Sequence, residues 1–152
     1  MRKKSPTPLI LLTLLIAPAW AQQLSLTIGN AVAAQTYRTK NMQFVFRVNG
    51  CADLSKAQVN AAAEGIVGDA RRTTPLHLIP GQPAGVYAIN PEWGNDGKWV
   101  VAISTTCLNE TAGAIVPVVG IGFIRESTQL LPHAPSQSEI EAALKAFTQP
   151  AH

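Results

Sequence analysis

Short segments in which apolar and polar residues alternate dominate this chain, and they constrain its fold more than any other feature. Between Gln22 and about Arg125, glycine, proline, asparagine or aspartate interrupts these segments at short intervals. Successive side chains of a strand point to opposite faces, so alternation places the apolar residues on one face of a sheet. Many short strands separated by turn residues are typical of a sandwich or barrel. The sequence therefore predicts an all-β domain.

About seven strands are expected. The clearest is 98–104, where Trp99, Val101 and Ile103 share one face and Trp99 is expected in the core. The Asp96-Gly97 pair before it is a strong turn signal, because both residue types tolerate positive φ. Pro117 restricts the last strand to an edge or a bulge. We expect strands at 24–28, 43–48, a segment ending near 67, 76–79, 85–89, 98–104 and 114–119.

The segment 54–64 fits two structures. Residues 55–58 can cap and start an alanine-rich helical turn, and alanine is a good helix former. Val59, Ala61 and Ala63 nevertheless alternate as they would in a strand. We expect a short helical or irregular entry, followed by a strand that reaches a turn at Gly68-Asp69.

Residues 1–21 have the three parts of a secretory signal peptide: Arg2, Lys3 and Lys4, an apolar run at 9–17, and the small-x-small site Ala19-Trp20-Ala21. The apolar run has about half of the roughly 20 residues that a membrane-spanning helix needs, and no second run of that length follows. The sequence therefore predicts a periplasmic or secreted domain that begins at Gln22. It also predicts no integral membrane segment after cleavage.

Signal cleavage would remove the formal net charge of +3. The chain has twelve Lys and Arg, and the three at positions 2 to 4 leave nine, which balance nine Asp and Glu. A domain without a basic surplus lacks the charge that drives binding to phosphate backbones. Nucleic acid is therefore not an expected partner.

Cys51 and Cys107 remain in the mature chain. Export favours their pairing in a disulfide, which would join two distant strand ends. A pair of thiolate metal ligands or a redox couple is the alternative, and the absence of CxxC spacing argues against it.

The predicted sandwich covers residues 22–128, and residues 129–152 are predicted to form a linker and an amphipathic C-terminal helix. Ser136 with Glu139, or Ser138 with Glu141, fits a capping box. One apolar stripe follows, formed by Ile140, Ala143, Leu144 and Phe147. The stripe either packs on its own domain or docks a partner, and in the second case Leu144 and Phe147 would be binding residues.

No catalytic or cofactor motif is present, since HExxH, GxSxG, P-loop and GxGxxG patterns are all missing. We therefore expect neither enzymatic activity nor a cofactor. Imidazole and thioether are plausible copper ligands, so Met42, His77 and His133 are the alternative metal-binding residues. His77 by itself is interpreted as a residue that faces solvent.

Trp93 follows Pro91 and Glu92 in a predicted loop. Loops at the end of a sandwich commonly carry function, so Trp93, with Glu92 beside it, is a candidate binding residue. The alternative is an aromatic side chain that folds over the end of the core.

The block Pro83-Ala84-Gly85-Val86-Tyr87, followed by Gly97-Lys98-Trp99-Val100-Val101, resembles the final hairpin of exported immunoglobulin-like domains of the YtkA and FixH type. In that group a G-x-Y strand leads through a short loop to a G-x-W strand. The resemblance implies an immunoglobulin-like antiparallel β-sandwich and a link with metal trafficking or respiratory-complex assembly. This chain departs from the group because it lacks an obvious histidine or methionine cluster.

Together these features predict an exported, non-enzymatic binding or accessory domain of the bacterial cell envelope. Its expected partner is an envelope or extracellular protein. A periplasmic copper-type chaperone is the alternative.

Overall fold

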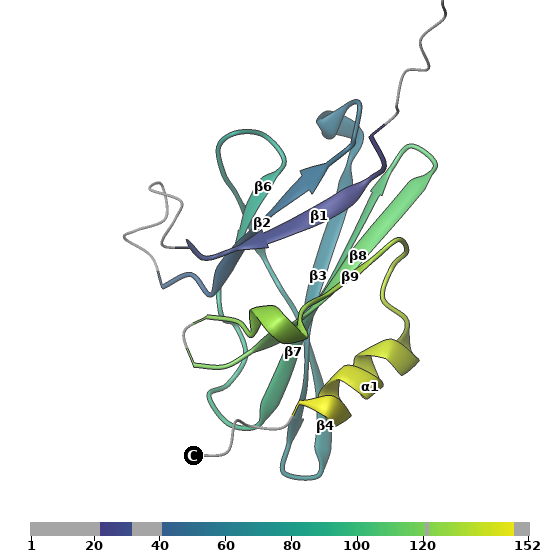
Figure 1. Cartoon of the computed structure of the whole chain (residues 1–152). Coiled ribbons are helices and arrows are strands. Elements are labelled where there is room, and N and C mark those ends of the chain that lie inside the picture. Colours follow the sequence, from purple (N-terminus) through teal and green to yellow (C-terminus); the bar gives the residue numbers. More distant parts are fainter. Residues whose placement is uncertain (1–21, 32–40, 121, 148–152) are drawn as a thin grey trace, which may run out of the picture.

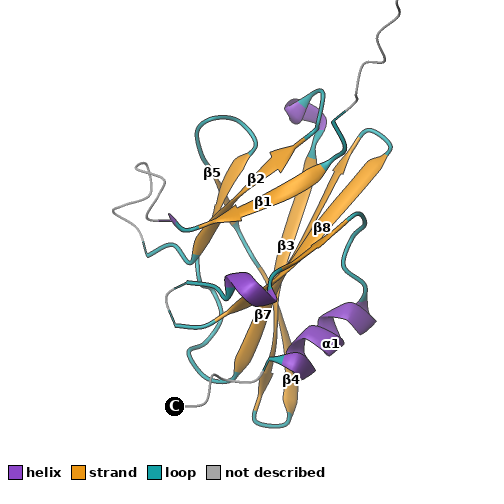
Figure 2. Cartoon of the chain, in the orientation of Figure 1, coloured by secondary structure: helices purple, strands orange, loops and turns teal. Residues whose placement is uncertain are grey.

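The computed structural model describes residues 22–31, 41–120 and 122–147. The predicted signal peptide lies outside these residues. Within them, nine antiparallel strands form two sheets and one α-helix follows (Figures 1 and 2). The prediction of an all-β sandwich with a short C-terminal helix is thus confirmed.

The first sheet has the order β1-β2-β6-β5 and the second the order β4-β3-β7-β8-β9. The first contains β1 (Ser25–Gly29), β2 (Phe44–Asn49), β5 (Leu78–Pro80) and β6 (Val86–Ile89). The second contains β3 (Gln58–Val67), β4 (Ala70–Pro75), β7 (Lys98–Cys107), β8 (Glu110–Val118) and β9 (Gln129–Leu131). Two 3₁₀ turns, η3 (Leu54–Lys56) and η4 (Arg125–Ser127), and the helix α1 (Gln137–Ala146) complete the described elements.

The segment 54–67 has the expected form, with the short turn η3 leading into the long strand β3. Two further strands were not expected. β4 is an edge strand that is almost wholly exposed, so its residues show no apolar alternation. β9 is a three-residue edge strand within the segment expected to be a linker. Exposed or very short edge strands leave no period-two signal, because neither of their faces is fully buried.

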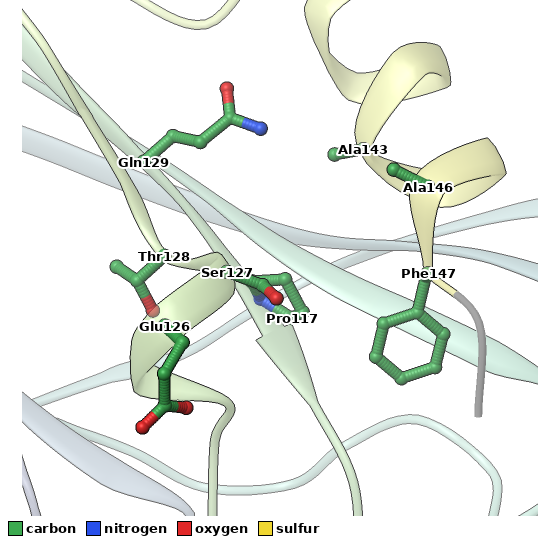
Figure 3. Close-up of a pocket in the computed structure, with 8 residues that line it drawn as sticks. All are labelled: Pro117, Glu126, Ser127, Thr128, Gln129, Ala143, Ala146 and Phe147. Carbon is green, nitrogen blue, oxygen red and sulfur yellow. The ribbon is translucent and has the colours of Figure 1, made fainter. Parts of the chain in front are cut away.

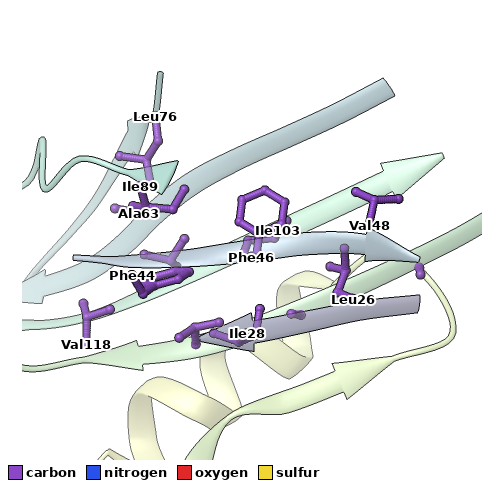
Figure 4. Close-up of a cluster of buried hydrophobic side chains, with 14 of the residues drawn as sticks. Leu26, Ile28, Phe44, Phe46, Val48, Ala63, Leu76, Ile89, Ile103 and Val118 are labelled. Atoms are coloured by element: carbon purple, nitrogen blue, oxygen red, sulfur yellow. The ribbon is translucent and has the colours of Figure 1, made fainter. Parts of the chain in front are cut away.

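The main core lies between the two sheets (Figure 4). Phe44, Phe46 and Val48 of β2 face it from one sheet, and Val101 and Ile103 of β7 from the other. Trp99 is 5% exposed and joins them, as expected. Full burial of such side chains stabilises the fold by about 1.5–3 kcal/mol each.

A disulfide joins the two sheets. Cys51 follows β2 and Cys107 ends β7, and their Cα atoms lie 5.8 Å apart. The predicted pairing of two distant strand ends is confirmed.

The helix α1 covers the outer face of the five-stranded sheet (Figure 1). Of the two capping boxes that the sequence allows, the helix begins with the one in which Ser136 and Glu139 bond each other's backbone N–H groups. The apolar stripe packs on the protein's own sheet, where Ile140 and Leu144 contact the cluster that contains Val100 and Ile115. Of the two alternatives for the stripe, packing on its own domain is the one observed.

Arg71 of β4 connects three elements on this side of the molecule. Its guanidinium lies 3.2 Å from Oε2 of the buried Glu64 on β3 and 3.5 Å from Oε1 of Glu141 on α1. The hydroxyl of Thr73 also donates to Glu64. The arginine therefore neutralises a buried carboxylate and attaches the helix to the sheet.

β6 and β7, which carry the block that resembles YtkA and FixH domains, lie in different sheets. They do not pair with each other, and residues 90–97 cross from one sheet to the other. Among the described residues, no helix has both the length and the apolar character needed to cross a membrane.

Candidate functional site

A cavity of about 510 Å³ lies at the end of the sandwich where β2 and β7 begin and β8 ends. We call it the Trp93 cavity. It is assembled from the approach to β2, the loop between β6 and β7, the segment after β8, and the residue that follows α1. The described residues that line it are Asn41, Met42, Gln43, Pro91, Trp93, Gly94, Asn95, Gly97, Trp99, Val118, Val119, Gly120 and Phe147.

Two tryptophans contribute to the wall of the cavity. Trp99 is held in place because its Nε1 donates to the carbonyl oxygen of Asp96 at 2.8 Å and its ring packs against Gly65, where a side chain would overlap it. Trp93 is half-buried and packs against the edge of the main core. It therefore packs on the core, which was one of the two alternatives, and it also contributes to the cavity wall. Its role in binding stays a prediction.

Gln43 was not identified from the sequence, where it lies on the polar face of a predicted strand. In the structure it is 4% exposed. Its Nε2 donates to the carbonyl oxygen of Gly120 at 2.8 Å and also to that of Gly122. A buried amide must find such partners, because an unpaired one costs free energy. Gln43 thereby attaches the segment after β8 to the start of β2.

Phe147 follows the last turn of α1 and is 6% exposed. It lines the Trp93 cavity and also a second cavity of about 260 Å³ (Figure 3). The second cavity is formed with Pro117 of β8, Ala143 and Ala146 of α1, and residues 126–129. One aromatic ring is thus shared by two adjacent cavities.

Glu92 does not line the Trp93 cavity, although Pro91 and Trp93 on either side of it do. Its Oε1 accepts from the backbone N–H of His77 at 3.1 Å, and its Oε2 lies 2.9 Å from His77 Nδ1. These hydrogen bonds, led by the one from the imidazole, lower the pKa of the Glu92 carboxyl. The pair attaches the Trp93 loop to the chain before β5.

The three alternative metal ligands have different surroundings. Met42 lines the cavity and packs with Val86 and Ala88 on the outer face of the first sheet. His77 is 90% exposed beside Glu92, and His133 Nε2 lies 3.6 Å from Glu139. No group of three His, Cys, Asp or Glu side chains within the described part of the chain is arranged to hold a metal ion. The copper-type site stays a prediction.

The four candidate binding residues therefore have three different locations. Trp93 and Phe147 line one cavity, and Glu92 supports the loop that carries Trp93. Leu144 is 2% exposed, on the face of α1 that packs against the five-stranded sheet.

None of the described residues lining the Trp93 cavity carries a formal charge, and none is an acid, a base or a nucleophile. The described lining therefore consists of aromatic, aliphatic and amide groups. Comparisons with protein-family models, with curated proteins and with solved structures found no match to this chain. The resemblance to YtkA and FixH domains stays a prediction.

Proposed function

We propose that the chain is an exported, non-enzymatic binding or accessory domain of the bacterial cell envelope, with the Trp93 cavity as its binding site. The main support is that Trp93 and Phe147, which are distant in sequence, line one cavity of about 510 Å³. Ligand sites in proteins commonly have volumes of about 300–1,000 Å³ and aromatic walls with a few polar groups.

The disulfide is consistent with export, because disulfides persist in oxidising compartments. The signal-like sequence of residues 1–21 also supports export. We further propose that the sandwich is immunoglobulin-like, in view of its two antiparallel sheets joined by a disulfide.

Site-specific photo-cross-linking tests the proposed function. The full chain is produced in its native host with a benzophenone amino acid at position 93, and a matched sample carries it at position 130. Leu130 is an exposed apolar residue, 58% accessible on β9, and does not line the cavity. We expect one discrete adduct with an envelope protein from position 93 and not from position 130.

Equal labelling from both positions, or no adduct from position 93, would contradict a specific partner at the cavity. Amino-terminal sequencing of the same exported protein tests the localisation. We expect it to begin at Gln22, and recovery of an uncleaved chain from the cytoplasm would contradict export.

A further inference from the structure

The chemistry of the Trp93 cavity is selective, because its walls are apolar or carry amides without charge. Indole and phenyl rings come from Trp93, Trp99 and Phe147, and aliphatic surface comes from Met42, Pro91 and two valines. Asn41, Gln43 and Asn95 supply amides. These groups favour a ligand that is flat or apolar and also forms hydrogen bonds.

Among the described residues, the charged side chains of Glu92, Asp96 and Lys98 lie close in sequence to the lining but do not belong to it. The Glu92 carboxylate binds His77. Lys98 lines a neighbouring hollow, formed with Ile66, Leu144 and Lys145, that shares only Gly97 with the described lining of the Trp93 cavity. Asp96 contributes its backbone carbonyl to Trp99 and is itself exposed to solvent. A charged ligand would lose hydration on entering without meeting an opposite charge, which costs several kcal/mol in an apolar site.

Part of the wall is already held in place. Trp99 is held by its hydrogen bond to Asp96 and by Gly65, and Gln43 by its bonds to Gly120 and Gly122. A preorganised wall reduces the ordering cost of binding. The indole of Trp93 brings an N–H donor to the lining, in addition to the side-chain amides.

Resting on the function proposed above, we propose that the cavity accepts an uncharged aromatic side chain of a partner polypeptide together with the peptide groups beside it. The aromatic ring contacts Trp93 and Phe147, and the peptide carbonyl accepts from the Trp93 indole. Side chains of Asp, Glu, Lys and Arg are excluded, since the described lining has no counter-charge for them.

Three probes that share one phenyl ring and differ in charge test this proposal. They are N-acetyl-phenylalaninamide, which is neutral, N-acetyl-phenylalanine, an anion, and phenylalaninamide, which is cationic below the usual α-amino pKa of about 7.7. Each is titrated at about pH 6 into the exported, purified protein while the indole N–H and side-chain amide signals are followed by NMR. We expect the neutral probe to shift the signals of Trp93 and Gln43, and both charged probes to bind at least about tenfold more weakly, a difference of about 1.4 kcal/mol.

Substitutions inside and outside the Trp93 cavity show whether the NMR shifts arise from binding in that cavity. Trp93→Ala is expected to abolish the shift of Gln43. Trp93→Phe keeps an aromatic wall but loses the indole donor, so it should bind the neutral probe more weakly than wild type and more tightly than Trp93→Ala, a graded loss that unfolding would not give. Leu130→Ala is the control for removal of an apolar side chain outside the cavity and should bind the neutral probe normally. Equal or tighter binding of a charged probe, shifts confined to other residues, or no shift with any probe would overturn the proposal.

These results are distinguishable from those that test the proposed function. If position 93 forms a cross-link but the cavity prefers a charged probe, a partner at the cavity is supported. Only the proposal that its ligand is uncharged is then overturned. Selective binding of the neutral probe without any cross-link supports the ligand chemistry and contradicts the envelope partner.

Discussion

The side-chain amide of Gln43 donates to the carbonyl oxygen of Gly120 at 2.8 Å and thereby joins the start of β2 in one sheet to the end of β8 in the other. Both residues line the Trp93 cavity. Since Gln43 is buried, this contact replaces water on both groups, and the integrity of the cavity depends on it.

Gln43→Glu is expected to destabilise the protein, because a carboxylate cannot donate to the two carbonyl oxygens. The loss of free energy of unfolding should be at least about 1–3 kcal/mol, the usual penalty for a buried unsatisfied group. Urea unfolding at neutral pH measures it. The same substitution at the exposed Gln58 on β3 is the control and should stay within about 0.5 kcal/mol of wild type. Equal stability of the two variants would contradict the role of Gln43.

Gly65→Ala is expected to displace Trp99, since an added Cβ would lie 2.8 Å from Cζ3 and nearer still to other ring atoms. Overpacking of this kind costs about 1–3 kcal/mol. Thermal unfolding and the near-ultraviolet circular dichroism of the tryptophans report both effects. Gly29→Ala on β1 is a matched strand substitution with only ordinary contacts and should leave the tryptophan signal unchanged. An unaltered tryptophan signal in Gly65→Ala would count against the packing described.

Removal of the disulfide by the double substitution Cys51→Ala and Cys107→Ala should destabilise the protein by about 4 kcal/mol. The cysteines are separated by 56 residues, and closing a loop of that length restricts the unfolded chain accordingly. Denaturant unfolding of the double variant, and of the wild type with and without reductant, measures the effect. If reduction left the unfolding midpoint unchanged, the bridge would not constrain the unfolded state.

Thr105→Val should stabilise the protein by about 1 kcal/mol. The Thr105 hydroxyl is buried on β7 and has no hydrogen-bond partner among the described residues. Replacing it with a methyl group of similar shape removes the cost of burying an unpaired polar group. Thr106→Val, at the exposed neighbouring position, is the control and should change stability by less than about 0.5 kcal/mol. A destabilised Thr105→Val would indicate that the hydroxyl has a partner.

The contact between His77 and Glu92 predicts an acid-dependent loss of stability. Because the pKa of Glu92 is lower in the folded protein than its usual value of about 4.3, the ionised carboxylate stabilises the fold above that pH. This contribution disappears as the pH falls through the folded pKa. Carbon-detected NMR titration of the Glu92 carboxyl measures the shift. A midpoint at or above the usual value would refute it.

If the Glu92 carboxylate stabilises the fold in this way, the free energy of unfolding of Glu92→Gln should fall less than that of wild type between about pH 5 and pH 3. The reason is that an amide does not titrate in this range. Urea unfolding at the two pH values gives the comparison. Glu126→Gln, which removes one carboxylate from the exposed turn η4, is the control for the loss of a negative charge.

Strands that face the core on one side were predictable because burial of one face leaves a period-two pattern. Phe44, Phe46 and Val48 follow that pattern, as do Trp99, Val101 and Ile103. β4 and β9 were missed because edge strands need no apolar face. The block at Gly85–Tyr87 and Gly97–Val101 was expected to form a hairpin, but its strands lie in opposite sheets, and alternation alone does not assign a strand to a sheet.

The sequence alone determined the local properties of this protein: the alternation of most strands, a capped helix near the C-terminus, and the one pair of cysteines available for a disulfide. These follow from interactions between near neighbours or from the absence of another partner. The tertiary structure alone decided that Trp93, Gln43 and Phe147 line one cavity, that Leu144 is buried between α1 and the sheet, and that Glu92 supports the Trp93 loop without lining the cavity. Such proximity arises from the packing of two sheets and a helix. These residues are far apart in the sequence, and no local pattern predicts that they are neighbours.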